Sequence, residues 1–122
     1  MASQSETFNF ITSNFQCEKL SENLLKVVIS WNDGRSQLVF ATVKADVMQI
    51  ASPFAKTSAI TAEQALNVNN TAFGIGIVAE WFALQHVVPL PDLDASEIDI
   101  AFNTVGELAD ELEKSLGLGD NL

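Results

Sequence analysis

Few side chains in this 122-residue chain carry reactive groups in a pattern that catalysis needs. His86 is the single histidine and Cys17 the single cysteine. A general base needs a carboxylate or hydroxyl partner in an open pocket, and a zinc site needs several ligands. His86 stands among apolar residues, and Cys17 stands beside the acid Glu18, which makes a thiol a poor nucleophile. We expect a structural or rim histidine and a structural or incidental cysteine.

Two glycine and acid patterns resemble binding loops only in part. Asp92, Asp94 and Ser96 have the spacing that begins a calcium loop. Such a loop also needs glycine at its sixth position and glutamate at its twelfth, where this chain has Glu97 and Asn103. Capping of a helix explains the acids instead.

The pair Gly74 and Gly76 begins a G-x-G-x-x-G phosphate loop, but the second half of the pattern is missing. No arrangement of serine, histidine and aspartate, and no pair of catalytic carboxylates, follows from the spacing. The sequence therefore predicts a protein that is not an enzyme and that uses no cofactor and no metal.

Charge excludes two classes of partner. The formal net charge is −10, from six basic and sixteen acidic residues. Nucleic acids and anionic membranes require clustered lysine and arginine, and here the basic residues are dispersed. Nine of the acids lie between Asp92 and Leu122. They form either a docking face for a basic partner or a solvated helix face, and the second reading is favoured.

Length and composition predict a single domain over residues 1–122, with 48% hydrophobic residues to form its core. No apolar run reaches the roughly 18 residues that a membrane helix needs. The first residues lack the basic and apolar regions of a signal peptide, and one cysteine cannot form an internal disulfide. We expect a cytoplasmic location.

The first half of the chain predicts a helix followed by three strands. Ser3 and Glu6 fit a capping box, and Phe8, Ile11 and Phe15 follow with helical spacing. The same segment also alternates with period two, so a strand is the alternative.

Strands are predicted over residues 24–31, 37–43 and 47–51 from apolar alternation. Residues 32–34 (NDG) form a hairpin turn between the first two of these. The strand over 37–43 is apolar on both faces, which suits a central position. Ser52 and Pro53 are expected to end the third strand.

The second half predicts a short helix, two strands and a long helix. Thr61 and Gln64 fit a capping box for a helix over residues 62–67. Strands follow over 73–79 and 82–90, with a turn near Glu80 and Trp81. Asp94 caps a helix over 95–116, whose apolar stripe is unbroken, and a glycine stands where a C-cap belongs. The stripe consists of Ile98, Ala101, Phe102, Val105, Leu108, Ala109, Leu112 and Leu116.

These elements predict an α+β fold in the order α-β-β-β-α-β-β-α. We expect a mainly antiparallel, five-stranded twisted sheet with the long C-terminal helix packed on one face. Four segments carry a resemblance to a known family: QIASPF at 49–54, ALN at 65–67, VPLP at 88–91 and ELADEL at 107–112. In these segments the chain resembles the YbjN-like proteins and the wider type III secretion chaperone-like (Tir chaperone-like) fold group, over about residues 20–117. The resemblance implies a small acidic homodimer that binds other proteins.

One sheet face is the candidate interface. Helices at the two ends of the chain can cover only one face of the sheet, and the other face must be polar or meet a partner. On the last two strands this face collects small residues and one aromatic anchor, the composition of an interface core. The alternative is that the short helix covers it. The residues are Gly74, Gly76, Val78, Trp81, Ala83 and Val87.

The sequence therefore predicts a non-enzymatic protein-interaction module, chaperone- or adaptor-like. We expect a homodimer built from the uncovered face and the short helix. A further partner would be a protein, held through the apolar face or a sheet edge, with the acidic helix as a steering rim. The alternative is a small-molecule or regulatory binding domain with a pocket between the sheet and the short helix.

Overall fold

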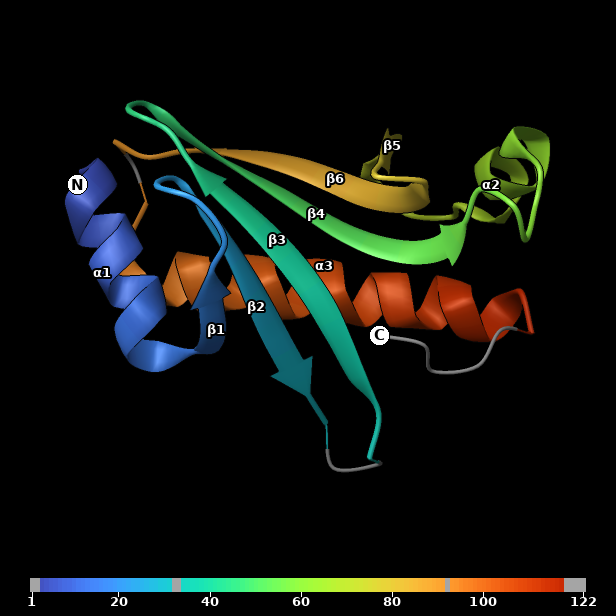
Figure 1. Cartoon of the computed structure of the whole chain (residues 1–122), viewed down its shortest axis with the longest axis horizontal. Helices are drawn as coiled ribbons and strands as arrows, with labels where there is room; N and C mark the ends of the chain where they lie inside the picture. Colours follow the sequence, from blue (N-terminus) through green and yellow to red (C-terminus); the bar gives the residue numbers. More distant parts are fainter. Residues whose placement is uncertain (1–2, 32–33, 92, 118–122) are drawn as a thin grey trace.

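The computed structural model describes residues 3–31, 34–91 and 93–117, which form one sheet and three helices (Figure 1). The elements are α1 (Gln4–Asn14), β1 (Gln16–Lys19), β2 (Leu24–Ser30), β3 (Ser36–Val43), β4 (Val47–Lys56), α2 (Ala62–Val68), β5 (Gly74–Val78), β6 (Trp81–Pro89) and α3 (Ala95–Ser115). The α+β class and the C-terminal helix are confirmed.

The sheet is antiparallel throughout, with the strand order β1-β2-β3-β4-β6-β5. Helix α3 crosses one face and contacts β2, β3, β4 and β6 (Figure 1). We call this the covered face and the opposite one the open face. Strands β1 and β5 form the two edges of the sheet.

The prediction of five strands was wrong, because the sheet has a sixth, β1. Strand β1 has no buried residue, and Cys17 pairs with Val27 of β2. A short charged edge strand leaves no apolar alternation, so its backbone pairing alone defines it. The element order is therefore α-β-β-β-β-α-β-β-α.

Strand β4 also runs further than predicted, through Pro53 to Lys56. A proline can lie in a strand where its missing N–H is not needed for the ladder. The register between β3 and β4 ends at the Phe40–Ala51 pair, before Pro53 is reached. Beyond it, the Ser52 hydroxyl donates to the Leu38 carbonyl at 2.6 Å. The side-chain amide of the buried Gln37 likewise donates to the carbonyl of Pro53.

These side-chain bonds replace a regular ladder, and β3 and β4 diverge beyond them (Figure 1). A bulge between Pro53 and Ala55 turns the end of β4 further. The sheet is therefore split along part of its length, and α3 lies behind the split. The split also shapes the open face of the sheet, where it lowers the surface between β3 and β4.

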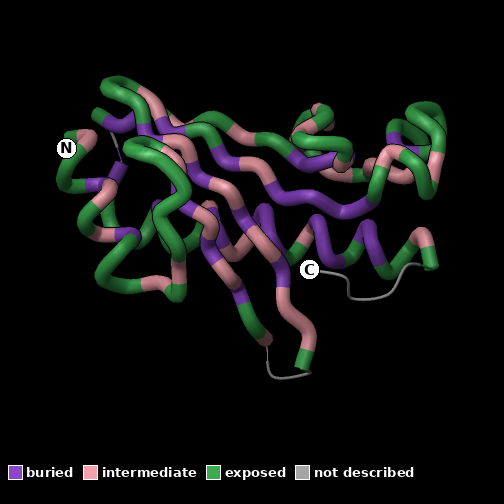
Figure 2. Tube along the Cα trace, viewed as in Figure 1, coloured by how far each residue is buried: buried purple, intermediate pink, exposed green. Residues whose placement is uncertain are grey.

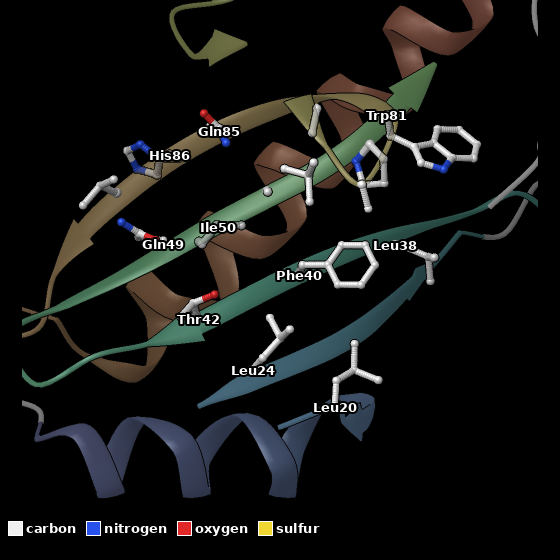
Figure 3. Close-up of a pocket in the computed structure, with 16 residues that line it drawn as sticks. Leu20, Leu24, Leu38, Phe40, Thr42, Gln49, Ile50, Trp81, Gln85 and His86 are labelled. Carbon is white, nitrogen blue, oxygen red and sulfur yellow. The ribbon is translucent and has the colours of Figure 1, made fainter. Parts of the chain in front are cut away.

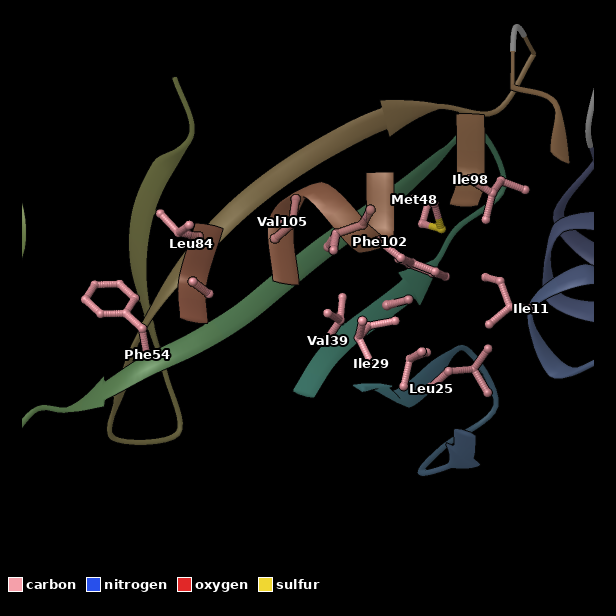
Figure 4. Close-up of a cluster of buried hydrophobic side chains, with 14 of the residues drawn as sticks. Ile11, Leu25, Ile29, Val39, Met48, Phe54, Leu84, Ile98, Phe102 and Val105 are labelled. Carbon is pink, nitrogen blue, oxygen red and sulfur yellow. The ribbon is translucent and has the colours of Figure 1, made fainter. Parts of the chain in front are cut away.

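The core lies between the covered face and α3 (Figure 2). Strand β3 lies between β2 and β4, as predicted for a central strand, but it buries only alternate residues although both of its faces are apolar. Gly106 brings α3 close to the sheet, because a Cβ there would lie 3.3 Å from Val39 Cγ2. The buried side chains drawn and labelled in Figure 4 are Ile11, Leu25, Ile29, Val39, Met48, Phe54, Leu84, Ile98, Phe102 and Val105.

The predicted helix caps are confirmed. Ser3 and Thr61 each form a complete capping box, and the Asp94 carboxylate accepts from the Glu97 N–H at 2.9 Å. Gly117 has a φ of +73°, the left-handed conformation expected after the last helix. In the predicted 32–34 turn, residues 32 and 33 lie outside the described residues, and Gly34 has a φ of +85°.

The turn between β5 and β6 is strained. It consists of Ala79 and Glu80, flanked by the Val78–Trp81 pair, and its φ angles are +48° and +69°. A side chain in the left-handed region costs about 1–2 kcal/mol, and this hairpin turn usually contains Asn-Gly.

The double variant Ala79→Asn, Glu80→Gly is therefore expected to raise the free energy of unfolding by about 1–2 kcal/mol. Urea unfolding at constant m-value measures the gain. The Thr57 N–H bond to the carbonyl of residue 80, at 2.9 Å, involves only backbone and should persist. An unchanged or lower stability would contradict the strain.

Candidate functional site: an uncharged groove on the open face

The open face carries a groove of about 620 Å³ (Figure 3). Its floor is the open face of β3, β4 and β6, and the end of β5 and the first part of β2 border it. The residues that line it are Leu20, Leu24, Leu38, Phe40, Thr42, Gln49, Ile50, Ala51, Pro53, Val78, Ala79, Trp81, Ala83, Gln85, His86 and Val87.

Two features of the strands create the groove. The divergence of β3 from β4 lowers the floor between Leu38 and Pro53. Ala51 on β4 and Ala83 on β6 line the floor, and their small side chains leave space above the backbone. Shape here follows from strand geometry and residue size rather than from a covering element.

The groove has an apolar end and a polar end. Leu38, Phe40 and Trp81 lie at one end (Figure 3). Toward the other end lie Thr42 and Gln49, which are cross-strand partners. Threonine and glutamine can each both donate and accept a hydrogen bond without carrying charge. The groove therefore fits a mostly apolar surface that carries some amide or hydroxyl groups.

Among the residues that the structure describes, those that line the groove include no lysine, arginine, aspartate or glutamate. This is notable in a chain with a net charge of −10. Two cations stand at the rim: Lys56 Nζ lies 5.7 Å from the centre of the Trp81 ring, and Lys26 is the cross-strand partner of Phe40. Depleted charge around an aromatic anchor is the composition of the core of a protein interface.

The six predicted interface residues share one face. The β5–β6 register pairs Gly74 with Gln85, Gly76 with Ala83, and Val78 with Trp81. Val78, Trp81, Ala83 and Val87 line the groove, and the two glycines lie beside it on the edge strand. A Cβ at Gly76 would collide with the side-chain amide of Gln85, so this glycine lets that amide lie across β5.

Sequence analysis missed the half of the groove that comes from β3 and β4. Leu38 and Phe40 face it, and they were predicted only as one side of a central strand. The missing information was the long-range order of strands, which places β4 beside β6. A strand that is apolar on both faces, and whose neighbouring strands have an open face that no helix covers, would have indicated the groove.

The short helix does not cover this face. No residue of α2 lines the groove, and Figure 1 shows α2 beyond the ends of β4 and β6. Its Ala65 packs into the core cluster instead. The groove is therefore not the predicted surface that combines the sheet face with the short helix. It is also not the predicted pocket between the sheet and that helix.

His86 and Cys17, the other candidate residues, pack against apolar neighbours. The half-buried His86 is the cross-strand partner of the buried Ile50, and its ring packs on Phe73 with centroids 4.8 Å apart. Cys17 is a half-buried thiol on β1 that packs against the core. Among the described residues, no three histidine, cysteine or acidic side chains gather where they could hold a metal ion.

The calcium-like acids act as a helix cap. Asp94 Oδ1 accepts from the Glu97 N–H at 2.9 Å and from the Ser96 hydroxyl at 2.8 Å. These bonds, the backbone bond first, favour the ionised carboxylate and lower the pKa of Asp94. The first acid of the motif, Asp92, lies outside the described residues.

The acidic helix differs from a simple solvated rim. Asp110 and Glu113 are buried, although both belong to the acids expected at the surface. Arg35 reaches them from the β2–β3 end of the sheet, with 2.8 Å from Nη2 to each carboxylate. These two acids therefore pair with Arg35 inside the fold, whereas Glu107 and Glu111 of the same helix are exposed to solvent.

Comparisons with family models, with curated proteins and with solved structures found no match. In the part of the chain that the structure describes, no helix has the length and apolarity needed to cross a membrane.

Proposed function

We propose that this protein is a non-enzymatic protein-interaction module, chaperone- or adaptor-like, that acts as a homodimer. The groove on its open face receives an uncharged, mainly apolar segment of a protein partner. The observation that carries this proposal is the charge-free lining around Trp81, in a chain of net charge −10. The resemblance to YbjN-like and secretion chaperone-like proteins supports it.

The energetics favour the groove over the acidic helix as the anchor. Buried aromatic residues contribute most of the binding energy at protein interfaces, whereas exposed charges mainly affect association rates. Trp81 and Phe40 supply aromatic surface, and Gln49 and Gln85 can bond to the backbone of a bound segment. The partner needs no positive charge to bind here.

A small-molecule ligand is the second candidate. A volume of about 620 Å³ lies within the usual range for ligand sites, and the polar end could orient a ligand. The groove is open along the sheet face, however, and ligand sites usually enclose most of their ligand. The shape thus favours a macromolecular surface.

A capture experiment with two lysine variants tests the proposal. Trp81→Lys places a charge in the groove, whereas Ile100→Lys places one on α3, at a side chain that is 62% exposed. Proteins retained from native extract by the wild type and by Ile100→Lys should be lost with Trp81→Lys. For a purified partner, we expect an affinity loss of at least about 2 kcal/mol.

Salt provides the second arm of this test. Raising salt from low to physiological strength should slow association and leave most of the affinity intact. If affinity collapses with salt and Trp81→Lys binds normally, the acidic surface is the site. A small molecule that copurifies with the wild type and is absent from Trp81→Lys, seen by native mass spectrometry, would favour the second candidate.

A further inference from the structure

The edge strand β5 is unprotected. It pairs with β6 on one side only, and its five residues include no charged residue and no proline. Ile77, on this strand, is 65% exposed. Proteins usually protect a sheet edge with charge, proline or a covering element, because a bare edge pairs with other chains.

The opposite edge is protected. Strand β1 is only four residues long and carries Glu18 and Lys19. Glu18 also forms an ion pair with Lys26 of β2, with 3.0 Å between Oε2 and Nζ. The sheet therefore has one edge open to pairing and one edge built against it.

The hairpin fixes which backbone groups of β5 point outward. Val78 and Trp81 flank a two-residue turn, a position at which hairpin partners exchange both hydrogen bonds. Bonded and non-bonded pairs alternate along an antiparallel ladder, so Gly76 and Gly74 also bond to β6. The N–H and C=O groups of Ile75 and Ile77 are left pointing away from the sheet.

We infer that β5 pairs antiparallel with β5 of a second copy, about a two-fold axis at Gly76. This inference rests on the proposed homodimer and names its interface. With this axis, Ile75 of one copy lies opposite Ile77 of the second copy, and the reverse. Each such pair exchanges two hydrogen bonds, so all outward groups of both isoleucines are satisfied.

The side chains fit the same register. Ile75 and Ile77 point to one face, where the two copies together form a cluster of four isoleucines and cover the exposed Ile77. On the other face the glycines leave room for the Gln85 amide across β5. The groove stays open, since its centre lies over β3, β4 and β6.

Two arguments select a second copy as the occupant. Pairing through β5 closes the assembly at two copies, because the protected β1 edges then remain outside. Charge at the edge does not oppose it: β5 contains no charged residue, and the two Glu80 residues, in the β5–β6 turns, lie at opposite ends of the pair.

Light scattering on three proteins tests the inference. The wild type should give about twice the 13.2 kDa chain mass at micromolar concentration. Ile77→Pro removes an outward N–H without removing a bond to β6, and it should give the mass of one chain. Trp81→Lys changes the open face and should keep the double mass. Circular dichroism checks the fold of each.

Disulfide trapping gives a second readout in a Cys17→Ser background. The axis brings Gly76 of the two copies to a Cα separation of about 4.5 Å, within the range for a disulfide. In a background that also carries Gln85→Ala, which removes the amide that a Cβ at position 76 would meet, Gly76→Cys should therefore crosslink on mild oxidation. Gly74→Cys is the matched control, because its copies lie roughly 13 Å apart along the strands and should not crosslink.

The outcomes separate this inference from the proposed homodimer. A monomeric wild type overturns both. If the dimer is lost in Trp81→Lys and kept in Ile77→Pro, the homodimer stands and the edge interface is overturned. The edge interface is also overturned if both variants lose the dimer or if both keep it. Should Ile77→Pro fail to fold, crosslinking at position 76 and not at 74 supports the edge, and any other crosslinking pattern overturns it.

Discussion

Arg35→Met is expected to lower the free energy of unfolding by about 3–5 kcal/mol. The substitution keeps most of the apolar stem and removes the guanidinium that bonds to Asp110 at 2.9 Å and to Glu113 at 2.8 Å. Those carboxylates are almost fully buried, with side-chain exposures of 7% and 1%. Removing the arginine leaves their negative charge buried without compensation, and an uncompensated buried charge is strongly destabilising.

A surface pair supplies the control. Lys26→Met breaks the Lys26–Glu18 pair, whose side chains are 34% and 62% exposed, and should cost less than about 1 kcal/mol. The double variant Arg35→Met, Glu113→Met should recover part of the loss, because Asp110 keeps Lys114 at 3.4 Å. Urea unfolding of this set together with the single variant Glu113→Met gives the coupling energy of the Arg35–Glu113 pair. Equal effects of Arg35→Met and Lys26→Met would show that burial does not strengthen the pair.

Phe102→Ala is expected to cost about 3–5 kcal/mol, the other large effect. Phe102 is fully buried on α3, and its ring meets Phe15 edge-on with centroids 5.0 Å apart. The substitution therefore opens a cavity between α3, the sheet and the end of α1. Both helices bound this site, so collapse can fill only part of it.

Thermal and urea unfolding measure the loss, with Ile100→Ala on the same helix as the control. That side chain is 62% exposed, so its truncation should change stability by about 0.5 kcal/mol or less. A small effect of Phe102→Ala, close to that of the control, would mean that α3 is not anchored at this position.

Local patterns predicted the elements that have a strong period or a cap. The apolar stripe from Ile98 to Leu112 and the capping boxes at Ser3 and Thr61 correspond to α3, α1 and α2. Strand β1 was missed because backbone pairing alone forms it. The extension of β4 past Pro53 was missed because the ladder toward β3 had already ended there.

The candidate site was predicted in part for the same reason. Neighbouring strands of a hairpin share a face by period two, which placed Val78, Trp81 and Ala83 together correctly. The contributions of Leu38 and Phe40 depend on β4 lying next to β6, a long-range pairing that no local pattern encodes. The burial of Asp110 and Glu113 depends on Arg35, about 75 positions away in the chain.

The position of α3 in the chain has a consequence for biosynthesis. This helix covers one face of the sheet, and it follows every strand in the sequence. At a translation rate of about 5–20 residues per second, its 21 residues take roughly 1–4 seconds to be made. During that interval a nascent chain with all its strands made has apolar surface on both sides. Until α3 docks, the nascent chain therefore exposes apolar strand surface that the folded protein covers.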